Sequence, residues 1–259
     1  MIGAAESAPC YDRVSGVQSS LRRYNLGAAL FHLAQAVVFL VLAGKVSIDV
    51  TSTFATGPPG EPVTADRLEV LFSYPLAPAV ALFSALSSAF HLLIVSPWGW
   101  RRYQNELANC QNRFRWVEYS LSASLMIVLI AGISDIAALI ALFGVNASMI
   151  LFGWLMETTN RPGPTASWTP FVFGCIAGAV PWVAIAVYLF GAERPPGFVY
   201  GIFVSIFVFF NCFAMNQWLQ YRRIGRWHDY LTGERAYITL SFVAKSLLAW
   251  QIYANVLAS

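Results

Sequence analysis

Seven long apolar runs, separated by short polar connections, follow one another along the chain. A membrane-spanning helix takes about 20 residues, and each run is long enough to form one. The pattern therefore predicts an all-α membrane protein, a seven-transmembrane helix bundle forming a single domain over residues 1–259. The predicted spans cover about residues 24–44, 71–95, 116–134, 136–156, 168–190, 198–219 and 236–256.

Two connections have patterns of their own. In the first, residues 46–70, the segment VSIDVTSTF alternates apolar and polar residues, and a turn rich in Pro and Gly precedes VTADRLEV. Such alternation predicts a short β-hairpin, which we expect on the membrane surface. Before the third span, QNELANCQNRFRW contains neither Gly nor Pro, so we expect the third helix to begin early, near Tyr103, and to project beyond the lipid.

Composition supports the membrane interpretation. Of the residues, 58% are hydrophobic, 15% aromatic and only 11% charged, and the net charge is +3. A soluble globular chain carries about 25% charged residues, because charge covers the surface in contact with water. The composition excludes a nucleic-acid binder, a secreted disulfide scaffold and a chain with a large soluble domain.

The cysteines and the N-terminal segment suggest no processing. Cys10, Cys110, Cys175 and Cys212 are far apart and form no CxxC pair, so we expect reduced thiols and neither a zinc site nor a disulfide framework. The first 25 residues are polar for too long to be a signal peptide, and no small-residue cleavage site follows the first apolar run. We therefore expect that run to remain a membrane span.

The basic residues are distributed unequally between the two sides of the predicted bundle. Twelve of the 16 lie with the N-terminus and the second, fourth and sixth loops, and three lie on the opposite side. Loops rich in Lys and Arg stay in the cytoplasm. The bias predicts a multi-pass protein of the cell membrane with a cytoplasmic N-terminus, an extracellular C-terminus and an extracellular hairpin.

Lys245 lies near the middle of the last predicted span. A lysine at the centre of a membrane helix costs about 2.5–3.5 kcal/mol, so it should be neutral, paired with an acid or covalently modified. A desolvated amine is a good nucleophile for a Schiff base, and a polyene aldehyde inside the bundle would supply the partner. The alternative is a transporter lysine that pairs with a carboxylate.

Glu118 is the one carboxylate well inside the other apolar runs, apart from Glu157 at the very end of the fourth. An acid beside a buried cation keeps its charge and stabilises that cation. Ser122 lies one turn after Glu118 and Ser241 one turn before Lys245, so each hydroxyl shares a helix face with its charged neighbour. Each serine alone is compatible with ordinary helix packing; together they indicate the polar lining of one site.

His32 and His91 lie in the first and second spans, and Ser87 lies one turn before His91. Counted from the cytoplasmic ends of their spans, these residues, Glu118 and Lys245 all fall in the inner half of the bundle. They predict an inner polar cavity, although an intramembrane histidine is more often a packing residue. The predicted span boundaries place Glu118 several residues shallower than Lys245. Helix tilt, the length of a Schiff-base arm, or a span start nearer Asn112 would close this gap.

At this point the residues match a known family. Seven spans, the segment RWVEYSLSASLM, the ending SFVAKSLL, His32, the Ser87/His91 pair and the structured first exterior loop resemble heliorhodopsins. These microbial-type retinal proteins have an inverted membrane orientation, and the charge bias indicates the same orientation here. The resemblance extends over essentially the whole chain and implies a rhodopsin-like bundle.

The resemblance implies all-trans retinal bound covalently to Lys245, with Glu118 as counterion and Ser122 and Ser241 near the Schiff base. His32, Ser87 and His91 would line the inner cavity. For the ring and polyene the family suggests Met126, Asn146, Phe210 and Gln217, and Trp182 is a further aromatic candidate from its position beside Pro181. The family also implies a homodimer to which the exterior loop contributes.

The distribution of titratable groups predicts a light sensor whose output is a conformational change. We also expect a slow photocycle, because the strained pocket would relax through slow helix motion, and no enzymatic activity. A proton pump needs protonatable groups on both sides of the Schiff base, yet Leu129 and Ser241 occupy positions where familiar pumps carry acids. The Arg-rich segment YRRIGRWHDYLTGER is a candidate surface for a cytoplasmic signalling partner. Two alternatives remain, a light-driven or light-gated ion transporter and a retinal-free transporter in which Lys245 pairs with Glu118.

Overall fold

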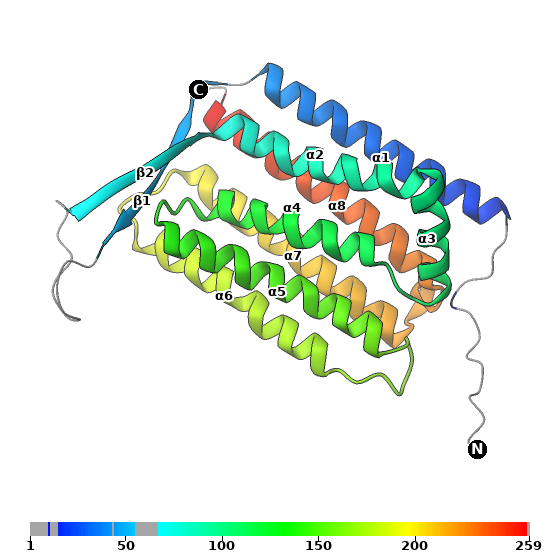
Figure 1. Cartoon of the computed structure of the whole chain (residues 1–259). Helices are drawn as coiled ribbons and strands as arrows, with labels where there is room; N and C mark the ends of the chain where they lie inside the picture. The colour runs from blue at the N-terminus through cyan, green and yellow to red at the C-terminus, as the bar shows by residue number, and fades with distance from the viewer. Residues whose placement is uncertain (1–9, 11–14, 43, 55–66, 258–259) are drawn as a thin grey trace.

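The computed structural model describes residues 10, 15–42, 44–54 and 67–257. Seven long helices run side by side in this part of the chain, with a short helix across one end and a two-stranded hairpin at the other (Figure 1). The long helices are α1 (Ser15–Val41), α2 (Leu76–Val95), α4 (Arg113–Ala131), α5 (Ile136–Thr159), α6 (Thr169–Gly191), α7 (Gly197–Arg222) and α8 (Tyr230–Ile252). The seven-helix bundle predicted from the sequence is confirmed.

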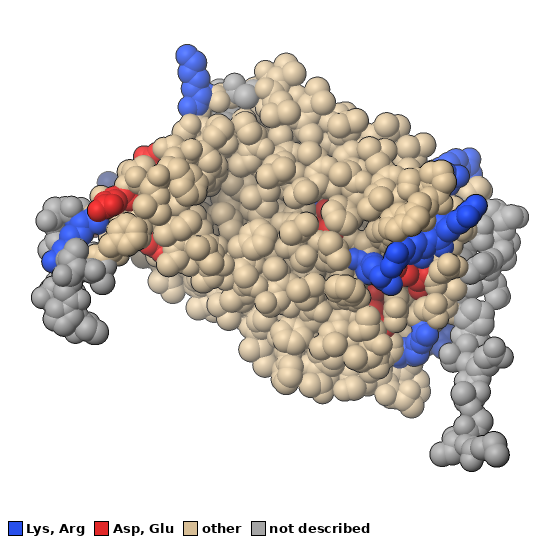
Figure 2. All heavy atoms as spheres, in the orientation of Figure 1, with Lys and Arg blue, Asp and Glu red and all other residues tan. Residues whose placement is uncertain are grey.

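Six of the long helices are long and apolar enough to cross a membrane. The seventh, α8, has a similar length but carries Glu234, Arg235 and Lys245, which lower its hydropathy. Because α8 packs against α1, α2 and α7, we treat it as the seventh span. On the face shown in Figure 2, charged side chains gather at the two ends, and the broad region between them is almost free of charge. The protein is therefore a multi-pass membrane protein.

The two ends of the bundle differ. At one end lie α3 (Pro97–Ala108), the connection from α5 to α6 and the connection from α7 to α8, which contains the 3₁₀ helix η2 (Gly225–His228). We call this the arginine-rich end. The opposite, hairpin end carries strands β1 (Ser47–Thr53) and β2 (Leu68–Pro75), and α8 continues there into one turn of π-helix, η3 (Tyr253–Leu257).

The hairpin forms in the predicted loop, but its second strand extends to Pro75, beyond the predicted end of the loop at residue 70. β1 and β2 are antiparallel, from Ser47 opposite Pro75 to Thr53 opposite Leu68, with an irregularity between Val50 and Thr51. Residues 71–75, predicted as the start of the second span, belong to β2 and not to α2. Backbone pairing with β1 decides this, because a short apolar run satisfies a strand as well as a helix.

The third span does not extend back to Tyr103 as predicted. α3 is a separate helix that ends at Ala108, and Cys110 adopts a left-handed backbone conformation with φ 55°. Asn112 then caps α4, its side chain accepting a hydrogen bond from the Arg115 backbone N–H at 3.1 Å. Asparagine is a favoured N-cap and tolerates turns, so it starts a new helix here without any Gly or Pro.

The prediction that all four cysteines are reduced thiols is wrong for one pair. Cys10 and Cys110 form a disulfide across a sequence separation of 100 residues, with their Cα atoms 5.4 Å apart. The Cys10 backbone N–H also donates to the Ala108 carbonyl at 3.2 Å. Sequence spacing gives no sign of this pairing, because only the fold brings Cys10 to the turn between α3 and α4. Cys175 and Cys212 are free.

Candidate functional site

The site is organised around a buried ion pair between α8 and α4. The Lys245 Nζ lies 2.5 Å from Glu118 Oε1 and 2.5 Å from the hydroxyl oxygen of Ser87 on α2. Ser87 in turn donates to Glu118 Oε1 at 2.7 Å. All three side chains are buried, so three helices bring a cation, an anion and a hydroxyl together away from water.

The depth gap between Glu118 and Lys245 disappears because α4 begins before the predicted span boundary at residue 116, although well after Tyr103. Its first residue is Arg113, with Asn112 as the cap, so Glu118 lies more than one full turn inside the helix. Of the flanking serines, Ser122 lies beside Glu118 and Ser241 beside Tyr119, and both are buried. The structure thus brings together the lysine and the acid that the sequence indicated. The hydroxyl that contacts both is that of Ser87, whereas those of Ser122 and Ser241 have no hydrogen-bond partner within the described residues.

The two histidines form a polar group on the arginine-rich side of the ion pair. Their rings are nearly parallel, with centroids 6.0 Å apart and an angle of 7° between the planes. His91 Nδ1 lies 2.8 Å from the Oδ1 of Asn25, a buried α1 residue that sequence reasoning missed. Neither ring nitrogen of His32 has a hydrogen-bond partner within the described part of the chain. Of the three residues predicted to line an inner polar cavity, His91 lines a small cavity, and His32 and Ser87 are buried but are not among its lining residues.

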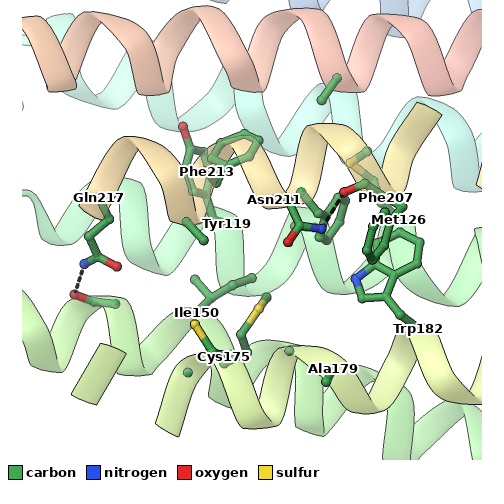
Figure 3. A pocket seen from close by; sticks show the side chains of 18 of the residues that line it. Tyr119, Met126, Ile150, Cys175, Ala179, Trp182, Phe207, Asn211, Phe213 and Gln217 are labelled. Carbon is green, nitrogen blue, oxygen red and sulfur yellow. Dashed lines mark hydrogen bonds between the residues drawn. The ribbon is translucent and has the colours of Figure 1, made fainter. Parts of the chain in front are cut away.

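A cavity of about 540 Å³ extends from Lys245 between α4, α5, α6 and α7. Its volume lies within the roughly 300–1,000 Å³ typical of small-molecule sites. Figure 3 shows Trp182, Met126 and Phe207 together at one end of the cavity and Gln217 at the other. The predicted residues that line it are Lys245, Ser241, Met126, Trp182, Phe210 and Gln217.

Aromatic side chains and glycines shape this cavity. Trp182 packs edge-on against Phe207 and Phe210, with ring centroids 5.2 and 5.5 Å away. Gly153 is required on the α5 wall, because a Cβ there would lie 2.4 Å from the Trp116 ring. An apolar, aromatic cavity that reaches a buried lysine fits a hydrophobic polyene attached to that lysine.

One residue predicted for the cavity lies elsewhere. Asn146 is not among the lining residues; it donates to the Ser124 hydroxyl at 3.0 Å.

A second polar cluster lies nearer the arginine-rich end. Arg115 on α4 forms ion pairs with both Glu157 on α5 and Glu234 on α8, and all three side chains are buried. Sequence reasoning missed this cluster because Arg115 was counted as a loop charge and Glu157 and Glu234 were placed at or beyond span ends. The one sequence signal for this cluster was the position of Arg115, three residues before Glu118. That spacing does not indicate which carboxylates pair with Arg115.

Neutral donors complete the second cluster. Glu157 accepts from the Trp116 Nε1 at 2.6 Å and from the Asn112 backbone N–H at 2.9 Å. Glu234 accepts from the Asn112 side chain at 2.7 Å and from the Tyr103 hydroxyl at 2.9 Å. Burial, followed by the nearby Glu234 carboxylate, raises the pKa of Tyr103 well above its ordinary value, so this tyrosine remains a neutral donor.

Comparison with known proteins agrees with this geometry. No curated protein matches the chain. The sequence model of the heliorhodopsin family matches residues 21–257, which include every helix that contributes to the site. Membership of that family implies a retinal chromophore and a light-responsive membrane protein. Because the match extends over nearly the whole chain, the protein belongs to the heliorhodopsin family.

Proposed function

We propose that this protein is a photoreceptor that binds all-trans retinal covalently and signals by conformational change, with a slow photocycle and without net ion transport. The observation that carries the proposal is the Lys245–Glu118 pair, 2.5 Å apart, at the wall of the aromatic cavity. A nucleophilic amine, an anion and an apolar cavity are the three parts that a retinal linkage requires. The non-enzymatic character expected from the sequence is part of this proposal.

Retinal, bound to the Lys245 nitrogen as a protonated Schiff base, would supply light absorption and isomerisation. Glu118 holds the compensating negative charge, because it is the carboxylate in contact with that nitrogen. Ser87 contacts both partners and fixes their relative position. Trp182, Met126, Phe210 and Gln217 line the cavity and orient its occupant.

The two histidines, His32 and His91, are candidate acceptors for a proton displaced from the Lys245 nitrogen. Ser87 connects Glu118 to α2, where His91 follows one turn later and contacts Asn25. His32 stacks on His91 at 6.0 Å. Neutral imidazoles accept protons reversibly, so a proton that leaves the Lys245 nitrogen has acceptors within the same half of the bundle.

The hairpin half of the bundle supports sensing over pumping. Leu129 is buried in an apolar cluster, so α4 provides no acid on that side of Glu118. Asp135 lies at the helix end, where its side chain accepts from the Ala138 N–H as the cap of α5. One observation favours the alternative of a light-driven or light-gated ion transporter: Ser205 and Gln251 form a polar pair in this half, with a hydrogen bond of 3.1 Å.

The assembly and orientation expected from the sequence are also part of the proposal. Strand β2 carries exposed apolar side chains, which are Leu68, Val70, Leu71 and Phe72. Exposed apolar edges favour association, so this strand supports a homodimer in which the hairpin contributes. The arginine-rich end would be cytoplasmic and would carry the surface for a signalling partner, along the connection from α7 to α8.

Adding retinal to membranes that contain the expressed protein tests the central claim. We expect visible absorption in the wild type, its loss in Lys245→Ala and its retention in Lys45→Ala, which removes the other lysine of the chain. Colourless wild-type membranes would overturn the proposal. Recording the pH of an illuminated cell suspension with and without a protonophore then separates the two functions, because a sustained light-induced pH change contradicts the sensor.

A further inference from the structure

The buried cluster of Arg115, Glu157 and Glu234 carries more negative than positive charge. One guanidinium stands between two carboxylates, and Arg115 is the cation that pairs with them within the described residues. All three side chains are buried, at 5%, 1% and 1% exposure. An uncompensated charge in a low-dielectric interior is costly, so a cluster with one carboxylate in excess has a strong tendency to bind one proton.

Among the residues that the structure describes, the other groups around the two carboxylates provide no second cation. Tyr103 from α3, Asn112 before α4, Trp116 from α4 and Tyr230 from α8 all donate hydrogen bonds to them. The ring of Tyr237 lies 3.9 Å from the Arg115 guanidinium carbon. On α7, Tyr221 donates to the Met156 carbonyl at 3.1 Å. These neutral groups stabilise charge locally but leave the excess of one carboxylate unchanged.

A small cavity joins this cluster to the Lys245–Glu118 pair. Its volume is about 20 Å³, and its lining includes Glu118 and His91 on one side and Glu234, Asn112 and Arg115 on the other. A space of this size accommodates about one water molecule. The Arg115 Nε is buried and has no hydrogen-bond partner within the described part of the chain, and such groups are usually satisfied by ordered water.

We propose that Glu157 and Glu234 form an internal proton-accepting site for the photoreceptor, reached from Glu118 and His91 through this single-water cavity. The inference rests on the proposed function. A proton that leaves the Lys245 nitrogen passes to Glu118 and onward through the cavity, and one of the two carboxylates becomes a neutral carboxylic acid. The Lys245 nitrogen loses that proton and Glu118 is again ionised, so no proton enters or leaves the protein. The reverse transfer restores the starting state.

The arrangement also links proton arrival to backbone structure. Asn112 contacts Glu157 through its N–H and Glu234 through its side chain, and it caps α4. Asn112 lies two residues after Cys110, which the disulfide joins to Cys10. Neutralising one carboxylate weakens its charge-assisted hydrogen bonds, because bonds to an ionised acceptor are roughly twice as strong as neutral ones. We therefore expect protonation of Glu157 or Glu234 to alter the conformation of the turn between α3 and α4.

Infrared difference spectroscopy of the retinal-loaded protein tests the proposal. On illumination, we expect a new carboxylic-acid C=O band in the wild type and its complete loss in the double variant Glu157→Gln/Glu234→Gln. Glu106→Gln is the matched control, because Glu106 lies at the same end, pairs with the exposed Arg113 and does not line the small cavity. The light-induced carboxylic-acid band should remain in the Glu106→Gln variant. Absence of the band in wild-type protein, or its persistence in the double variant, would overturn the proposal.

A titration of the retinal-free protein gives an independent readout. We expect the same carboxylic-acid band to appear as the pH falls, with a parallel change in tryptophan fluorescence, since Trp116 donates to Glu157. Each single variant should change the amplitude or frequency of this band, which keeps the test available if the double variant does not fold. Unaltered titration in both single variants contradicts the inference. A coloured, light-responsive protein that fails here refutes the proton site alone, whereas a colourless protein refutes the proposed function.

Discussion

The two halves of the bundle are built from the same seven helices but from different side chains. Toward the arginine-rich end, α1, α2, α4, α5 and α8 bury a connected set of polar and charged residues, which are Asn25, His32, Ser87, His91, Asn112, Arg115, Glu118, Glu157, Glu234 and Lys245. Toward the hairpin end, the buried residues form apolar clusters that include Phe39, Val80, Ile206, Leu248 and Ile252. Figure 1 shows that the helices run continuously through both halves.

The apolar half therefore contributes mainly to folding stability, whereas the polar half also carries the groups for proton transfer. Apolar clusters are held by packing, and each deletion costs according to the cavity it leaves. Buried polar networks depend on complete pairing, so removing one partner leaves the others uncompensated. Proton transfer needs titratable groups within hydrogen-bond reach of one another, and such groups are connected in the polar half. Changes there should alter both stability and spectroscopy, whereas changes at residues of the apolar half that do not line the large cavity should alter stability alone.

The largest expected effect comes from Arg115→Gln. It leaves Glu157 and Glu234 buried without their cation, and breaking a buried ion pair from one side costs about 3–5 kcal/mol of unfolding free energy. Thermal unfolding in detergent measures the loss. Arg113→Gln is the control, because Arg113 is exposed and its pair with Glu106 contributes about 1 kcal/mol or less. Equal losses in the two variants would contradict the special position of Arg115.

Ile206→Ala tests the apolar half. Ile206 is fully buried in the first half of α7, and truncation of a core isoleucine costs about 2–5 kcal/mol. The same unfolding assay measures it. We expect the absorption spectrum of the retinal-loaded protein to stay unchanged, since Ile206 does not line the large cavity. A spectral shift comparable to that of a change at Glu118 would remove the distinction between the halves.

Glu118→Gln tests the ion pair itself. The amide retains hydrogen-bonding capacity toward Ser87 and Lys245 but loses the charge, so we expect a loss of about 1.5–3 kcal/mol, the contribution of a hydrogen bond to a charged group. In the retinal-loaded protein, the absorption band should shift to the red, because the compensating anion is gone. Glu69→Gln, in the exposed strand β2, should change neither quantity. An unchanged spectrum would mean that another anion stabilises the cation.

The smallest effect concerns the shape of the large cavity. In Gly153→Ala the new Cβ meets the Trp116 ring at 2.4 Å, so the ring must move, at a cost of about 1–3 kcal/mol. We also expect slower formation of the coloured protein after retinal is added. Gly144→Ala, on the same helix with nothing within 4 Å, should instead be neutral or stabilising by about 0.5–1 kcal/mol. Identical behaviour of the two variants would show that Gly153 does not limit the cavity.

Much of the architecture follows from local pattern. The apolar runs determine the long helices, because lipid leaves a backbone of this length no other way to satisfy its hydrogen bonds. Lys245 and Glu118 stand out in the sequence because a charge within an apolar run requires a partner. The helix spacing that joins Ser122 to Glu118 and Ser241 to Lys245 is equally local, and so is the alternation that predicts β1.

The remaining features depend on contacts between distant segments. The part of β2 that lies within a predicted span, residues 71–75, is decided by pairing with β1, and the break between α3 and α4 by the Asn112 cap. The Cys10–Cys110 disulfide and the cluster of Arg115 with Glu157 and Glu234 join segments far apart in sequence. A sequence reveals that a buried charge needs a partner, because that cost belongs to one residue. Which residue becomes the partner is a property of helix packing, and only the tertiary structure decides it.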